Sequence, residues 1–74
     1  MDKAFLNKYK DQLEWIRKKK LLTMAKMSQE VGISHPVYSN FVRFPERHLR
    51  LKTLRIIKCY VDWQLEIIGD KYGE

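Results

Sequence analysis

The chain has 74 residues, 45% of them hydrophobic, and a formal net charge of +6 at pH 7. This length fits a single domain, which we place at residues 1–74, and the hydrophobic content argues against global disorder. The one cysteine, Cys59, excludes an internal disulfide, and no apolar run approaches the roughly 18–20 residues of a membrane span. We therefore expect a soluble cytoplasmic protein with no membrane partner.

Positive charge is concentrated in the middle of the chain. Residues 17–58 hold eleven Lys or Arg against two Glu, which gives +9, whereas residues 1–16 are neutral and residues 59–74 carry −3. A basic segment of this kind is typical of a surface that binds nucleic acid, although many charged runs are only solvated.

The first predicted helix covers about residues 2–19. Its apolar residues recur at three- and four-residue spacing: Leu6, Tyr9, Leu13 and Ile16. Asp2 is a suitable N-cap, and the basic run at residues 17–20 suits the negative end of the helix dipole. That run can be a plain solvated helix end or a group that binds phosphates, and the sequence leaves both open.

Residues 23–43 predict two short helices joined by a tight turn. Thr23 is an N-cap for the first helix, and Gly32 ends it because glycine readily adopts positive φ. Ser34 can cap the second helix, and Pro36 is tolerated in its first turn. Helices this short are not stable alone, so we expect both to pack on a third.

Apolar spacing assigns the buried sides of these two helices. The expected inward residues are Met24, Met27 and Val31 in the first, Ile33 in the turn, and Val37 or Tyr38, Phe41 and Val42 in the second. The second helix should end by about Arg43, because Pro45 disfavours helix at Phe44. We expect Phe44 to fill the underside of the next loop, which also holds His48.

The last predicted helix covers about residues 51–68 and is followed by Gly69. It has two neighbouring apolar stripes, which is more apolar surface than a small domain covers from one side. The excess either wraps the protein's own core or marks an interface. The candidate homodimer interface is formed by Tyr60, Trp63, Ile67 and Ile68. Cys59, in the middle of this helix, is expected to be a small buried side chain.

A small residue, Ser28, lies four positions before Gly32, where the paired helices come closest. The turn reads Gly32-Ile33-Ser34, and Val31, Tyr38 and Phe41 complete the apolar pattern around it. Together with residues 51–54, this pattern resembles the Xre/Cro-type helix-turn-helix domains of phage and bacterial regulators, over about residues 21–61. The resemblance implies an all-α, lambda-repressor-like bundle of four to five helices that contains a helix-turn-helix.

Two positions depart from the family pattern. Met24 stands where many members carry a glutamine that contacts the DNA backbone, and Arg50 stands where a capping serine is common. The first departure removes one expected phosphate contact, and the second changes the start of the last helix.

The resemblance implies that the helix after Ser34 enters the major groove of double-stranded DNA, so that its exposed side chains meet base edges. The predicted base contacts are Ser34, His35, Ser39, Asn40 and Arg43. The predicted phosphate contacts are Lys26, Gln29, Arg47, Arg50, Lys52 and Arg55. Asparagine can bond adenine and arginine can bond guanine, each through two hydrogen bonds, whereas phosphate contacts give affinity without sequence preference.

No catalytic arrangement is evident in the sequence. His35 and His48 have no carboxylate or cysteine at ligand spacing, and no glycine-rich phosphate loop is present. We expect no enzyme activity, no metal, no cofactor and no small-molecule substrate. The favoured function is a phage or prophage transcriptional regulator that binds DNA as a homodimer. The alternative is a small interaction module that uses the same scaffold to bind or inhibit a host protein.

Overall fold

The structure is a computed structural model, and it describes residues 3–47 and 49–68. This part of the chain holds four helices and no strand: α1 (Lys3–Lys19), α2 (Met24–Val31), α3 (His35–Arg43) and α4 (Leu51–Ile68). The all-helical class is therefore confirmed, and the described helices lie close to the predicted ranges. The expectations for Asp2, His48 and Gly69 lie outside the described residues.

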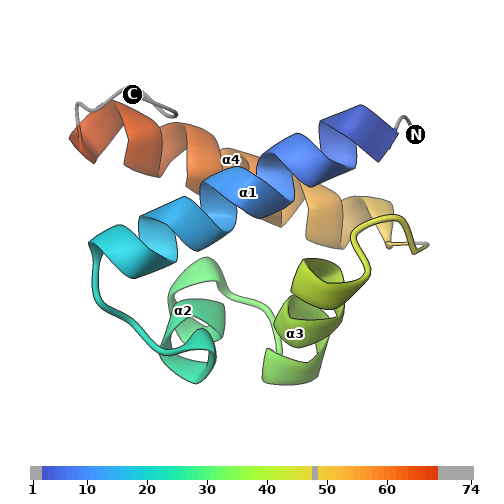
Figure 1. The fold of residues 1–74 in the computed structure, drawn as a ribbon, viewed down its shortest axis with the longest axis horizontal. Coiled ribbons are helices and arrows are strands. Elements are labelled where there is room, and N and C mark those ends of the chain that lie inside the picture. Colours follow the sequence, from blue (N-terminus) through green and yellow to red (C-terminus); the bar gives the residue numbers. More distant parts are fainter. Residues whose placement is uncertain (1–2, 48, 69–74) are drawn as a thin grey trace.

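The helices form two pairs. Figure 1 shows α1 crossing α4, with α2 and α3 next to each other below that pair. α1 also packs on α3, and α2 also packs on α4, so the two short helices are held by both long ones. The largest fully buried side chains, which come from all four helices, are Leu13, Ile16, Met27, Tyr38, Ile57 and Val61. None of the described helices is long and apolar enough to cross a membrane.

The segment from Thr23 to Phe44 is ordered by local capping hydrogen bonds. The Thr23 side chain accepts from the backbone N–H of Lys26 at 3.1 Å, and the Ser34 side chain accepts from Val37 at 3.3 Å. Gly32 has a φ of 93°, in the left-handed region that glycine adopts at low cost. The caps and the turn predicted from the sequence are thus confirmed.

The connection between α1 and α2 holds an unusual residue. Leu21 has a φ of 58°, which is uncommon for a residue with a Cβ atom, and it is 91% exposed. The backbone N–H of Leu22 donates to the carbonyl of Arg17 at 3.0 Å across this turn. Leu21 therefore occupies a position at the end of α1 that favours glycine.

Two apolar predictions were wrong. Phe44 does not fill the underside of the loop, because it is 44% exposed and the Arg47 guanidinium lies 4.4 Å from the centre of its ring. Cys59 is exposed, not buried. The inner face of α4 is formed by Ile57 and Val61, and a residue midway between these positions lies on the opposite side of a helix.

Candidate nucleic-acid interface

The outer side of α3 carries most of the predicted base contacts. Ser34, His35, Asn40 and Arg43 are exposed, and Ser39 is half-buried. The Ser34 oxygen accepts the cap hydrogen bond, so this side chain orients the helix as well as facing solvent. α3 itself contains no acidic residue and a single Arg or Lys, so its outer side is polar with little charge.

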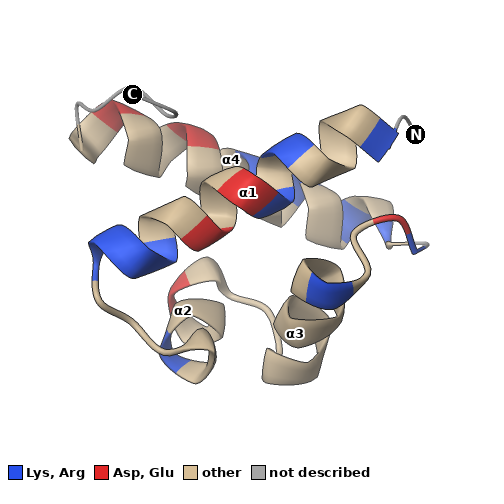
Figure 2. Cartoon of the chain, in the orientation of Figure 1, with Lys and Arg blue, Asp and Glu red and all other residues tan. Residues whose placement is uncertain are grey.

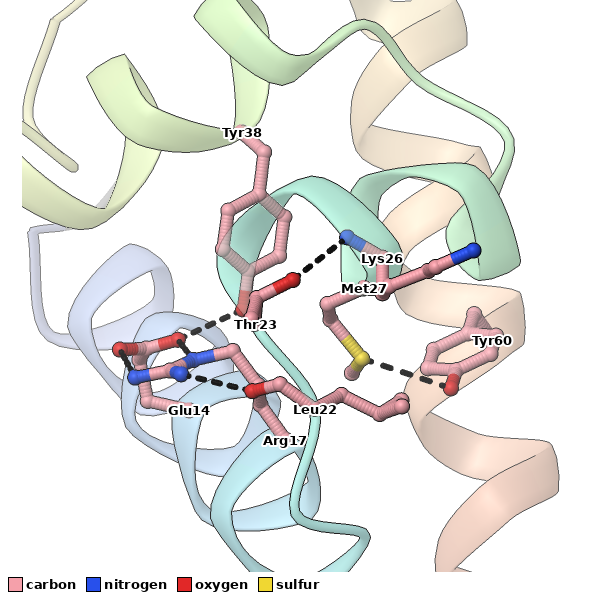
Figure 3. Close-up of polar contacts among 8 residues, drawn as sticks. All are labelled: Glu14, Arg17, Leu22, Thr23, Lys26, Met27, Tyr38 and Tyr60. Atoms are coloured by element: carbon pink, nitrogen blue, oxygen red, sulfur yellow. Dashed lines mark hydrogen bonds and ion pairs between the residues drawn. The ribbon is translucent and has the colours of Figure 1, made fainter.

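The inner side of α3 is attached to α1. Tyr38 is fully buried, and its hydroxyl donates to Glu14 Oε2 at 2.6 Å. Glu14 also accepts from Arg17 Nε at 2.8 Å and from Arg17 Nη2 at 3.0 Å. Arg17 Nη1 donates to the Leu22 carbonyl at 2.8 Å (Figure 3). This network joins α1, α3 and the connection that precedes α2.

The network changes the pKa of both of its central groups. Burial acts to raise the pKa of Glu14, but hydrogen bonds from Arg17 and Tyr38 and the charge of Arg17 outweigh it, so the pKa is lowered. Burial, together with the hydrogen bond to Glu14, raises the pKa of Tyr38 well above its ordinary value. At neutral pH the pair is therefore a neutral phenol that donates to a carboxylate.

A second network of the same kind attaches α2. Tyr60 of α4 donates to Glu30 Oε2 at 2.9 Å, and Lys20 Nζ lies 2.8 Å from the same oxygen. The Tyr60 hydroxyl also lies 3.7 Å from the Met27 sulfur (Figure 3). The hydrogen bond from Lys20, opposed in part by burial and aided by Tyr60, lowers the pKa of Glu30. The end of α1, α2 and α4 are thus joined by one carboxylate.

These networks decide the role of two residues in the basic run. Arg17 is bound to Glu14 and Lys20 to Glu30, so both cations act within the protein. Glu30 is the only acid between residues 23 and 45, and its charge is offset by Lys20. The surface of the α2–turn–α3 segment therefore carries no acid without a basic partner.

Cations lie at the ends of this segment (Figure 2). Lys26 and Gln29 are exposed on α2. Arg43 and Arg47 line a cleft of about 600 Å³ together with Lys10 of α1 and Glu46. Sequence reasoning did not place Lys10 here, because its approach to the end of α3 depends on how α1 packs; its Nζ lies 2.6 Å from Asp11 Oδ1, so its charge is already paired within α1.

The structure divides the predicted phosphate contacts into two groups. Lys26 and Gln29 lie on α2, and Arg47 and Arg50 lie in the loop after α3; all four are exposed. Lys52 and Arg55 are exposed on α4, and Arg55 lines a different groove of about 510 Å³. That groove is mainly apolar and is formed by Val31, Arg55, Ile56, Cys59, Tyr60 and Trp63.

The predicted dimer interface is also divided. Trp63 and Ile67 are each 58% exposed, and Ile68 is half-buried against the core. Tyr60 is only 8% exposed and its hydroxyl is bound to Glu30, so it offers little surface to a partner beyond the ring edge that lines the α4 groove. Both possibilities for this apolar surface, core and interface, were open from the sequence, and α4 has residues of both kinds.

No group of three His, Cys, Asp or Glu side chains among the described residues is placed to hold a metal ion. No protein-family model, curated protein or solved structure matches the chain. Functional assignment therefore rests on the surfaces and charges described above.

Proposed function

We propose that the protein is a sequence-specific double-stranded DNA-binding regulator of transcription, with α2 and α3 as a helix-turn-helix and α3 as the helix that enters the major groove. By the sequence resemblance, we place it among phage or prophage regulators. The observation that supports this most is the two-sided character of α3. Its inner side is held by buried Tyr38 and Phe41, while Asn40 and Arg43 face solvent.

A helix that reads bases must be rigid and must approach DNA without an acid in the way. The caps at Thr23 and Ser34 and the Glu14–Tyr38 hydrogen bond supply the rigidity. The pairing of Glu30 with Lys20 offsets the repulsion that a bare carboxylate would exert on phosphates. Glu46, which lines the cleft beside Arg43 and Arg47, lies 3.4 Å from the Lys3 ammonium, so its charge is also offset.

The roles of individual residues follow from their places. Asn40 and Arg43 are suited to adenine and guanine edges. Lys26 and Arg47 flank α3 on two sides and are suited to phosphates, which set the position of the helix on the duplex. Two copies bound to half-sites about 34 Å apart would contact one face of the duplex.

Selection of bound duplexes from a random pool tests this function. We expect a short enriched sequence, repeated in inverted orientation, with Asn40→Ala relaxing preference at one position and costing about 1–3 kcal/mol of binding free energy. Lys26→Ala should weaken binding to all sequences, while Lys8→Ala, which removes an equivalent exposed charge from α1, should change it less. A pool that shows no enrichment would reject sequence-specific binding.

The exposed apolar side chains Trp63 and Ile67 support the second candidate, a module that binds or inhibits a host protein. In that case Asn40→Ala would leave partner binding unchanged, and Trp63→Ala would abolish it. Capture of the host partner by the wild-type chain and by both variants separates the two functions.

A further inference from the structure

Within residues 3–47 and 49–68, one face of α4 packs little against the other helices, and only Ile56 on it touches the core. Residues on this face recur at intervals of three and four, as positions on one side of a helix do. They are Lys52, Arg55, Ile56, Cys59, Asp62, Trp63 and Glu66. All are exposed except Ile56, which is half-buried. The face is centred on Cys59, with an apolar groove beside it.

The charges on this face are separated along the helix. Lys52 and Arg55 lie in its first half, and Asp62 and Glu66 lie in its second half. Asp62 is bound to Lys58 of the same helix at 3.0 Å, so Glu66 is the acid of this face that can pair with another chain. The apolar side chains of this face are Ile56, next to Arg55, and Trp63, next to Asp62. A face of this kind repels a parallel copy of itself, because like charges would meet. It attracts an antiparallel copy, because each basic half then lies on an acidic half.

We propose that α4 pairs with α4 of a second copy of the chain, antiparallel, about a two-fold axis at Cys59. Such an axis matches residues that are equally far from Cys59 on either side. Lys52, seven positions before, then meets the partner's Glu66, seven positions after. Arg55, four positions before, meets the partner's Trp63, four positions after, in the geometry of a cation–π contact.

The groove favours the same arrangement. Arg55, Ile56 and Cys59 form part of its lining, so the partner's Trp63 enters a mainly apolar space next to a guanidinium. The symmetry repeats this contact on the other side, which makes the surface self-complementary. Eighteen residues of helix extend for about 27 Å, long enough for both contacts and both ion pairs. Lys52 and Arg55 are thereby assigned to self-association in place of phosphate contact.

The single cysteine permits a direct test, since a short bismaleimide can join two chains only through Cys59 of each. We expect a covalent dimer from the wild-type chain, and a monomer–dimer equilibrium by analytical ultracentrifugation without DNA. Lys52→Glu alone and Glu66→Lys alone should each weaken the dimer by about tenfold, because two ion pairs become like-charge pairs. The double exchange should restore both the dimer and the cross-link.

Lys8→Glu serves as a matched charge reversal at an exposed position of α1 and should leave dimerisation unchanged. Helix content by circular dichroism verifies that each variant folds. A monomer at all concentrations, or a dimer in which the double exchange is as weak as either single exchange, would overturn the proposal. Because the measurement uses no DNA, its result is independent of whether the chain binds DNA.

Discussion

Tyr38, on the inner side of α3, connects this helix to α1 through its hydroxyl group. Its ring is fully buried, and its hydrogen bond to Glu14 crosses from α3 to α1. Tyr60 makes a similar bond to Glu30, but in a more exposed setting. The Glu14 side chain is 15% exposed, whereas the Glu30 side chain is 41% exposed. The first hydrogen bond is therefore the stronger, since water competes less for the carboxylate.

Replacing each tyrosine by phenylalanine compares the two bonds with nearly the same change in shape. We expect Tyr38→Phe to lower the free energy of unfolding by about 1.5–3 kcal/mol, the usual range for a hydrogen bond to a charged group. Tyr60→Phe should cost less, because Glu30 keeps its contact with solvent and with Lys20. Urea unfolding of both variants measures the difference, and equal losses would contradict this ranking.

Acid should destabilise the protein through the two paired carboxylates. The pKa of Glu14 and the pKa of Glu30 are lowered in the folded chain. Their contribution is thus present above the ordinary Glu pKa of about 4.3 and is lost as the pH falls below it, through the folded values. Unfolding followed from pH 7 to pH 3 should show this loss, and Glu14→Gln should reduce its size. An unchanged pH profile in Glu14→Gln would argue against the role of Glu14.

At the scale of helices, local signals predicted more than spacing alone could. The ends of α2 and α3 follow from Thr23, Gly32 and Ser34, because a cap is decided by residues within one turn of it. The predicted range of α4, residues 51–68, matches the structure for a different reason, its continuous apolar periodicity. The exposure of Phe44 was not predictable, because it depends on which helix covers the loop. The exposure of Cys59 follows from its place opposite Ile57 and Val61, so helical spacing could have predicted it.

Leu21 and Gly32 both have positive φ, so exchanging the residue type at each should change stability in opposite directions. Leu21→Gly should stabilise the protein by about 0.5–1 kcal/mol, because it relieves a conformation that is unfavourable with a Cβ atom and removes little packing at 91% exposure. Gly32→Ala should destabilise it by about 1 kcal/mol, although the added Cβ meets no atom within 4 Å. Thermal unfolding measures both, and shifts of the same sign would contradict the backbone explanation.

At the scale of the molecule, ion pairs decide which basic residues are available to bind a partner, and the sequence showed this only in part. The excess of basic residues over positions 17–58 was evident, but the pairing of Arg17 with Glu14 and of Lys20 with Glu30 was not. Glu14 and Arg17 lie three residues apart on α1, so their pair follows from helix geometry, whereas the pair of Lys20 with Glu30 joins two segments that only the fold brings together. The candidate site on α3 was predicted from local residues, while the cleft that Lys10 shares with Arg43 required the structure.

Ionic strength should separate the two proposed interactions of the molecule. DNA binding should weaken steeply as salt rises, because several phosphate contacts release counterions. The α4 pairing combines ion pairs with apolar contact, so its dissociation constant should change much less. Titrations of duplex binding and of self-association between 50 mM and about 500 mM salt compare the slopes. A self-association slope as steep as that for DNA would indicate that charge alone drives the pairing.

The segment from Glu14 to Lys20, which covers the end of α1 and the residue after it, is bonded to both short helices. Glu14 holds α3 through Tyr38, and Lys20 holds α2 through Glu30. A displacement of this segment therefore acts on α2 and α3 at the same time. Because Tyr60 also joins Glu30 to α4, the two short helices stay attached to both long helices, and these side-chain contacts set the angle between α2 and α3 together with the turn at Gly32.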